Sequence, residues 1–231
     1  MRGITFNEKH SIKDFALYVE NLDISPPSKK KIKETIPFMQ GCYDFSLLYG
    51  TNTFDERVLS YTFKIIAENP MMLNVIKTQV NNWLLGCGQC QLYDDAIPGY
   101  YFLAECTRIA EKDDRYETTL DITFTTYPFK IGETYEGNNL WDSFNFELDV
   151  LQDTKFTVNG TSSVSIYNPS VIDIEPEIIA SSQFEITLDN KKYVVEAGTS
   201  KDYRFKFKKG NNNITLKGNG TIEFKFRKEV L

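Results

Sequence analysis

Residues 91–106 form the segment around which the rest of the chain is organised: Gln-Leu-Tyr-Asp-Asp-Ala-Ile-Pro-Gly-Tyr-Tyr-Phe-Leu-Ala-Glu-Cys. Strand-like runs flank Asp94-Asp95 and Pro98-Gly99. Asp bonds its own backbone in turns, Pro presets φ, and Gly accepts a positive φ. The run after the turn is aromatic and half apolar. The segment therefore predicts a β-hairpin, or two short strands joined by a tight corner.

Upstream of this segment, the sequence predicts a half-buried strand followed by one amphipathic helix. Apolar and polar residues alternate along the predicted strand, which places Leu59, Tyr61, Phe63 and Ile65 on one face. Asn69 is a suitable N-cap, and Pro70 suits the first helical position. Leu73, Ile76 and Val80 recur at steps of three and four, and Gly86 can end the helix. We expect one helix over residues 70–85, with its apolar stripe facing a core.

The N-terminal residues predict two short strands. Ile4–Phe6 would form the first strand, Asn7-Glu8-Lys9 a turn and Phe15–Val19 the second strand. The basic run at Lys29-Lys30-Lys31 follows a Pro-Pro pair, and the overall acidity favours a solvated loop end over a phosphate contact.

Downstream, a polar, Gly-rich stretch over residues 131–139 suggests a domain boundary, which divides the chain into 1–135 and 140–231. The second part reads as strands only, separated by turn residues, and this pattern is typical of a β-sandwich. Its clearest aromatic residues alternate with charged ones in the register of buried side chains: Tyr203, Phe205, Phe207, Phe224 and Phe226. The expected fold class is mainly β.

Composition excludes several functions. The 231 residues carry a net charge of −6, whereas nucleic-acid binding depends mostly on Lys and Arg. The four cysteines are too few for a disulfide scaffold. No stretch approaches the roughly 20 apolar residues of a membrane span, and the N-terminus contains no apolar run typical of a signal peptide. We expect the protein to fold in a cytoplasm.

The residues that could carry chemistry favour structural roles. Cys87 and Cys90 follow the C-terminus of the predicted helix, where the helix dipole opposes a reactive thiolate, and no second ligand pair for zinc lies nearby. His10 is the only histidine, and it lies in a predicted turn. Asp94 and Asp95 are neighbours on an extended chain and point to opposite faces, so they suit a turn better than a glycosidase pair. We expect no enzyme, no cofactor and no metal site.

Several pieces of the sequence resemble the distal tail proteins (Dit) of long-tailed phages that infect Gram-positive bacteria. They occur in the family's order and together span nearly the whole chain: Ile4–Ser11, Tyr43–Ser46, Tyr61–Phe63, Trp83–Leu85, Leu92–Asp95, Pro98–Tyr101, Tyr127–Phe129, Asn168-Pro169 and Arg227–Leu231. Glu8 stands where the family pattern suggests Gly, and Cys87–Cys90 replaces a Ser/Pro/Gly loop.

The resemblance implies a structural protein of the virion tail tip. Its N-terminal domain, a β-sandwich with one helix, would form a hexameric ring, and its C-terminal domain would be a galectin-like β-sandwich. The ring would join the tail tube protein to the tail-tip hub protein, hold receptor-binding or other baseplate proteins, and let DNA pass without binding it. The candidate subunit-interface hairpin comprises Tyr93, Asp94, Asp95, Pro98, Gly99, Tyr100 and Tyr101.

An alternative from another class is a carbohydrate-binding adhesion module of the tail tip, suggested by the galectin-like half and the 13 tyrosines.

The charge of the first 139 residues bears on the channel that such a ring would enclose. They contain 14 basic and 19 acidic residues, a net charge of −5. Because carboxylates repel phosphates, we expect a ring channel that is acidic or neutral, with Lys29 to Lys31 and Lys33 facing elsewhere.

Overall fold

The computed structural model describes residues 2–48, 52–114, 117–137 and 150–231. The chain forms two compact units, residues 1–130 with Leu231, and residues 131–230. The sequence places the end of the first domain at residue 135 and the start of the second at 140. Residues 138 and 139 of the candidate boundary lie outside the described residues. The mainly β fold class is confirmed, since strands are the main regular structure of both units.

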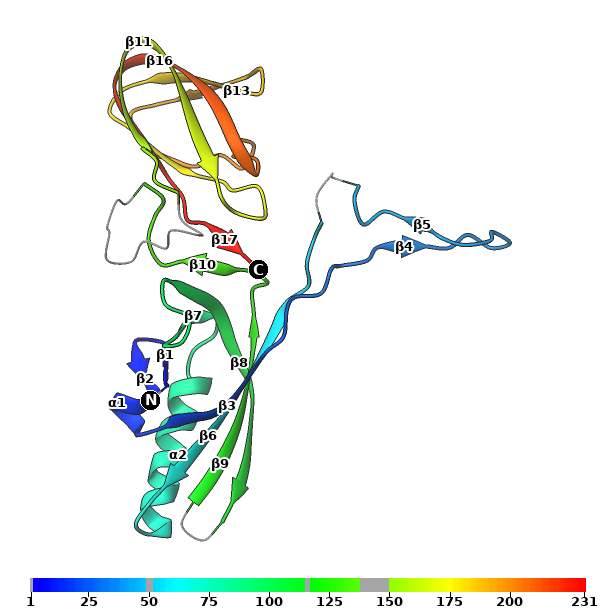
Figure 1. The fold of residues 1–231 in the computed structure, drawn as a ribbon, viewed down its shortest axis with the longest axis vertical. Coiled ribbons are helices and arrows are strands. Elements are labelled where there is room, and N and C mark those ends of the chain that lie inside the picture. Colours follow the sequence, from blue (N-terminus) through cyan, green and yellow to red (C-terminus); the bar gives the residue numbers. More distant parts are fainter. Residues whose placement is uncertain (1, 49–51, 115–116, 138–149) are drawn as a thin grey trace. The chain divides into compact units, whose positions relative to one another are not determined.

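The first unit contains an antiparallel sheet with the strand order β2-β1-β7-β8-β9-β6-β3 (Figure 1). The strands are β1 (Ile4–Phe6), β2 (Lys9–His10), β3 (Tyr18–Ile24), β6 (Arg57–Ile66), β7 (Cys90–Asp94), β8 (Tyr100–Asp113) and β9 (Glu117–Thr126). β6 pairs with β9 along its whole length, from Arg57↔Thr126 to Ile66↔Glu117. The predicted alternation in β6 is confirmed, because Leu59, Tyr61, Phe63 and Ile65 are all buried.

Helix α2 (Pro70–Leu85) covers the range that the sequence predicts. The Asn69 side chain caps it by accepting a hydrogen bond of 2.8 Å from Met72 N. Its buried residues, which include Leu73, Val80 and Trp83, belong to the same core as β1, β6 and β9. The Trp83 indole donates a 2.7 Å hydrogen bond to Phe6 O, so the helix is also attached to β1 by a buried polar contact.

The prediction of a strand at Phe15–Val19 is wrong. Ser11–Phe15 forms a short helix, α1, and β3 begins only at Tyr18. His10, expected in a turn, is the N-cap: its Nδ1 accepts from Ile12 N at 3.1 Å, while Asp14 accepts from His10 N at 2.7 Å. This reciprocal capping satisfies amide groups that a five-residue helix would otherwise leave unpaired.

The second unit is built on a long antiparallel ribbon of β11 (Lys155–Asn168) and β16 (Gly210–Lys225), paired from Lys155↔Glu223 to Asn168↔Gly210. β16 also pairs with β13 (Phe184–Leu188) and, further along, with β12 (Glu177–Ala180). β14 (Lys191–Val195) pairs with β13, and β15 (Gly198–Ser200) pairs with β12. β14 and β15 therefore form one edge of the sheet, while β10 (Lys130–Gly132) pairs with β17 (Glu229–Val230).

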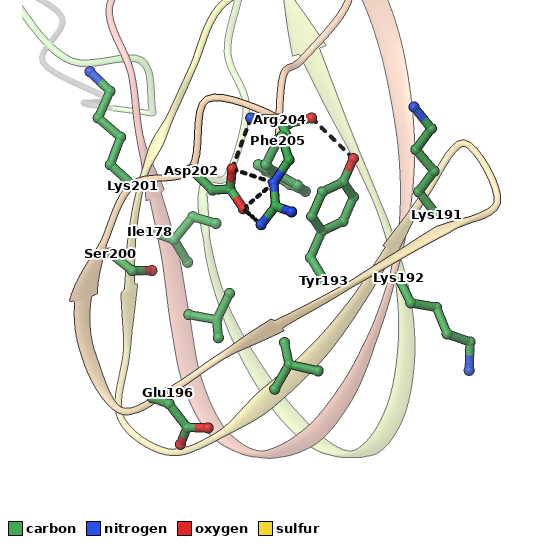
Figure 2. A pocket seen from close by; sticks show the side chains of 12 residues that line it. Ile178, Lys191, Lys192, Tyr193, Glu196, Ser200, Lys201, Asp202, Arg204 and Phe205 are labelled. Atoms are coloured by element: carbon green, nitrogen blue, oxygen red, sulfur yellow. Dashed lines mark hydrogen bonds and ion pairs between the residues drawn. The ribbon is translucent and has the colours of Figure 1, made fainter.

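The core of the second unit is aromatic. Phe205, Phe207, Phe224 and Phe226 are buried, as the sequence predicts. The expected strand over 203–208 is wrong, however, because residues 201–209 form no strand and Phe207 makes only an isolated bridge with Ile174. In this segment Phe205 N donates to Asp202 O, which forms a turn between the two residues labelled in Figure 2. Phe205 is buried, whereas Tyr203 is exposed.

Candidate assembly surfaces

The predicted hairpin is confirmed. β7 and β8 pair antiparallel, from Cys90↔Ala104 to Tyr93↔Tyr101. The connecting turn begins with Asp94, whose Oδ1 accepts a 2.9 Å hydrogen bond from Ala96 N, and ends at Gly99, which has a φ of 79°. A side-chain cap and a glycine with positive φ are the features that the sequence pattern requires.

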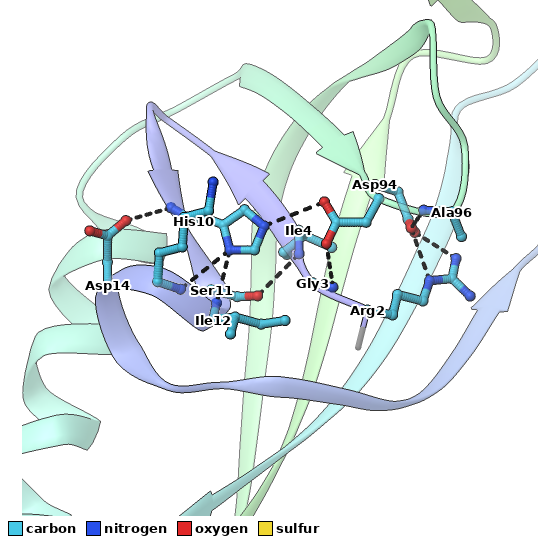
Figure 3. A network of polar contacts seen from close by, with 11 residues as sticks. Arg2, Gly3, Ile4, His10, Ser11, Ile12, Asp14, Asp94 and Ala96 are labelled. Atoms are coloured by element: carbon cyan, nitrogen blue, oxygen red, sulfur yellow. Dashed lines mark hydrogen bonds and ion pairs between the residues drawn. The ribbon is translucent and has the colours of Figure 1, made fainter.

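Asp94 is the centre of a buried polar network (Figure 3). Its side chain is fully buried, and Arg2 contacts both carboxylate oxygens, at 2.9 Å from Nε and 2.7 Å from Nη2. The Tyr61 hydroxyl donates to Oδ2 at 2.9 Å. Burial and the Asp94 charge raise the pKa of Tyr61, so this phenol remains a donor. Asp94 thereby connects the N-terminal residues, β6 and β7.

Asp95, the next residue of the turn, is exposed. Its Oδ2 accepts a 2.8 Å hydrogen bond from Gly3 N, and its Oδ1 lies 3.4 Å from His10 Nε2. Because His10 Nδ1 accepts hydrogen bonds from α1, a neutral imidazole must carry its proton on Nε2, facing Asp95. The sequence indicates a turn role for both aspartates but gives no sign of these partners.

The other residues of the candidate hairpin differ in exposure. The Tyr93 and Tyr101 rings lie 5.5 Å apart across the strand pair, and Tyr101 is buried. Tyr100 is half-buried, with the Lys130 ammonium 5.9 Å from its ring centroid. Pro98, like Asp95, is exposed. The buried members stabilise the unit itself, whereas Asp95 and Pro98 are accessible to a neighbouring molecule.

A second surface, which the sequence patterns above do not indicate, is the arm between β3 and β6, described over residues 25–48 and 52–56. Figure 1 shows its two short strands, β4 (Lys33–Glu34) and β5 (Tyr43–Asp44). Few contacts hold them: Lys33↔Asp44 and Glu34↔Tyr43 pair, and Ile32 N donates to Ser46 Oγ at 2.9 Å. Such a short two-stranded ribbon has little stability of its own in water.

The arm exposes large apolar side chains. Leu48 is 67% exposed, Leu47 58% and Ile36 55%. The remaining exposed apolar residues of the arm are Ile32, Phe38, Tyr43 and Phe45. Clustered apolar exposure of this kind marks protein contact surfaces more often than solvent-facing ones. A signal was present in the sequence, since apolar residues occur over 32–48 without the alternation that a half-buried strand would show.

The cysteines lack the features of a reactive site. None of the four forms a disulfide, and burial raises the pKa of the Cys87 thiol to about 11. A protonated thiol is a weak nucleophile and a poor metal ligand at neutral pH. Within the described residues, no three His, Cys, Asp or Glu side chains are grouped as metal ligands. No helix in the same residues is long and apolar enough to cross a membrane.

Comparison with solved structures shows that the chain has the fold of the phage distal tail (Dit) proteins, which confirms the sequence resemblance at the level of fold. One similar structure is that of the Dit protein (gp 19.1) of phage SPP1, described as a paradigm of the hub adsorption apparatus in phages infecting Gram-positive bacteria. The alignment covers 100% of both chains with a TM-score of 0.66 and 14% identity.

Two structures of the phage P2 baseplate in its activated conformation, with Ca and with Sr, match more weakly. Each alignment covers 99% of this chain and 98% of the other, at a TM-score of 0.47 and identities of 8% and 9%. No protein-family model matches the sequence, and no curated protein is similar to it.

Proposed function

We propose that this protein is a structural component of a phage tail tip whose copies assemble into a ring, most simply a hexamer. The ring would join the tail tube to the tail-tip hub or baseplate. The fold shared with SPP1 Dit over both entire chains supports the tail-tip role. The proposal assigns the molecule contact surfaces rather than a catalytic site, and its place is the virion tail tip after assembly in the host cytoplasm.

The arm is the observation that carries the self-assembly part of this proposal. Its large apolar side chains are exposed instead of packed in a hydrophobic core. Its two-residue strands need contact with another surface to be held in one conformation. A neighbouring copy of the same chain supplies such a surface at every position of a closed ring. The exposed part of the hairpin, Asp95 and Pro98, is the second proposed subunit contact.

The second unit would be a galectin-like domain that holds receptor-binding or other baseplate proteins. The carbohydrate-binding alternative requires an exposed aromatic platform, but the phenylalanines that alternate with charged residues, Phe205, Phe207, Phe224 and Phe226, are buried. We therefore expect no measurable binding of simple neutral sugars. A competable signal from the whole protein on a glycan array would favour the adhesion function instead.

The experiment that tests the ring is a measurement of mass, by light scattering coupled to chromatography, together with electron micrographs of the purified protein. We expect rings, and we expect replacement of Ile36, Leu47 and Leu48 by Gln to convert them to subunits. The matched control replaces Met71, Met72 and Val75 by Gln, because these residues are also apolar and exposed but lie on α2.

Two results would contradict the proposal. One is a stable monomer of the unmodified protein at high micromolar concentration, with no rings on a grid even after the tail tube protein is added. The other is a pair of variants that assemble equally well. Circular dichroism and thermal unfolding of both variants separate loss of assembly from loss of folding.

A further inference from the structure

The second unit contains a recess of about 790 Å³ beside its edge strand (Figure 2). Six consecutive residues, Lys191–Glu196, line one side of it, and they comprise all of β14. Ser200 of β15 lines the rest of the rim, together with Lys201, Asp202 and Arg204. Its volume is within the range of specific ligand sites, about 300–1,000 Å³.

The backbone of β14 borders this recess. β14 pairs with β13 on one side, and no strand among the described residues pairs with its other side. Side chains that point to both faces of β14 line the recess, so the recess follows the unpaired edge of the strand. The unpaired N–H and C=O groups of an edge strand are a template for an added extended chain.

The floor of the recess is apolar, and Tyr193 in its wall is held by two contacts. Ile178, Val195 and Phe205 contribute the floor, and all three are buried. The Tyr193 hydroxyl donates a 3.0 Å hydrogen bond to Arg204 O, and its ring packs edge-on against Phe205 with 5.0 Å between centroids. Apolar side chains on one face of an added strand could contact this floor without rearranging it.

The rim of the recess carries excess positive charge although the whole chain is acidic. Four cationic residues line it, Lys191, Lys192, Lys201 and Arg204, against two anionic ones, Glu196 and Asp202. Arg204 is held by Asp202 at 2.8 Å, and Lys192 pairs with Glu185 at 2.9 Å. Within the described parts of the chain, Lys191 and Lys201 form no ion pair, so their charges are available to a ligand.

We propose that the recess binds an extended, acidic segment of a partner protein, which adds a strand to the unpaired edge of β14. Lysines on an edge strand discourage pairing with neutral or basic strands, and the same charges favour a strand that presents carboxylates. The free backbone edge selects a peptide, the apolar floor selects alternating apolar residues, and Lys191 and Lys201 select Asp and Glu. This proposal does not depend on ring formation.

The probe is a blocked peptide of about eight residues, in which Glu and Asp alternate with Val and Ile, long enough to form a strand. Its binding to the whole protein is measured by calorimetry. Two further peptides carry N-methyl groups at alternate residues, the first at the odd and the second at the even positions. Because the N–H groups of alternate residues point to the same edge of a strand, each of these peptides lacks the backbone donors of one of its two edges. We expect at least one of the two N-methylated peptides to bind about tenfold or more weakly, since main-chain hydrogen bonds supply much of the affinity of a peptide that adds a strand to a sheet.

The charge test replaces Lys191 and Lys201 by Glu. Both side chains are exposed, and we expect the fold to persist and peptide affinity to fall about tenfold or more at low salt. Lys112→Glu is the control, because Lys112 is exposed on β8 of the other unit and changes the net charge without touching the recess. A version of the peptide with Lys in place of its acidic residues should not bind the unmodified protein.

Three results would overturn the proposal. The first is an acidic peptide that binds no better than its Lys version. The second is N-methylation without effect at either set of alternate residues, which would mean that charge alone attracts the peptide. The third is a sulfated oligosaccharide that binds more tightly than the peptide and loses affinity in the Lys191→Glu/Lys201→Glu variant, which would identify the recess as a site for anionic glycans.

Discussion

At the scale of single residues, Asp94 shows how a turn residue can also organise a subunit. A carboxylate without solvent is costly unless it is fully bonded, and Asp94 accepts hydrogen bonds from Arg2, Tyr61 and the backbone of Ala96. Its neighbour Asp95 has the same chemistry but is exposed. The two positions therefore form a natural pair for comparing a buried with an exposed carboxylate.

We expect Asp94→Asn to lower the free energy of unfolding by about 2–3 kcal/mol, because the amide places donors against Arg2 and Tyr61 and leaves buried groups unpaired. Asp95→Asn should cost less than about 1 kcal/mol, since solvent replaces its contacts. Urea unfolding of both variants measures the difference. Equal effects at the two positions would show that the network contributes little to stability.

The sequence could predict the turn at Asp94 but not this network. A turn is a local property of neighbouring residues, whereas the partners of Asp94 lie 92 positions away at Arg2 and 33 positions away at Tyr61. No periodicity links residues at such separations. His10 was misplaced for a related reason, because histidine is not among the usual N-cap residues and its capping role depends on the ring orientation.

At the scale of elements, β16 changes partners along its length. Its pairing with β13 ends at Gly218, and its pairing with β12 begins at Ile222. The turn between β12 and β13 is next to the residues of β16 that separate these two pairings. Ser181 N donates to Thr221 O at 2.9 Å, and Thr221 N donates to Ser181 Oγ at 2.8 Å. A Cβ at Gly218 would lie 2.6 Å from the Phe184 ring, so glycine is required by the close approach of the two strands.

Gly218→Ala should therefore lower the free energy of unfolding by about 1–3 kcal/mol, as overpacking does in well-packed interiors. Gly88→Ala is the control, because a Cβ there meets no atom within 4 Å. Thermal unfolding followed by circular dichroism compares the two variants. A Gly218→Ala protein as stable as the control would mean that β13 and β16 can move apart at little cost.

Sequence patterns predicted the elements that have a clear period and two clear ends. β6 has four alternating apolar residues, and α2 has an Asn-Pro start and a glycine after its last residue. The patterns failed where a segment is placed by contacts elsewhere in the unit. Apolar and charged residues alternate over residues 203–208 as in a strand, yet this segment is a loop. Its Phe205 and Phe207 side chains are part of the core of the second unit.

At the scale of the whole molecule, the charge distribution bears on the proposed channel. The chain carries a net charge of −6, and residues 1–139 account for −5 of it. A channel that lets DNA pass must not retain it, and each phosphate neutralised by Lys or Arg strengthens retention through counterion release. An acidic or neutral ring wall suits this role.

We expect the whole protein to show no salt-sensitive binding to duplex DNA at low ionic strength. A fluorescence polarisation titration with a short duplex measures this, and a basic DNA-binding protein serves as the positive control. Tight binding that weakens steeply with salt would contradict an acidic or neutral channel, as would a ring structure whose inner wall is lined mainly by Lys and Arg.

The pairing of β11 with β16 has a consequence for how the protein is made. β11 is the first long strand of its unit and β16 is the last. Lys155 therefore cannot pair until its partner Glu223 has been synthesised. A ribosome adds about 5–20 residues per second, so β11 emerges several seconds before its partner exists. We expect the nascent second unit to remain sensitive to protease until β16 has left the ribosome, while the first unit, whose last long strand ends at Thr126, becomes resistant earlier.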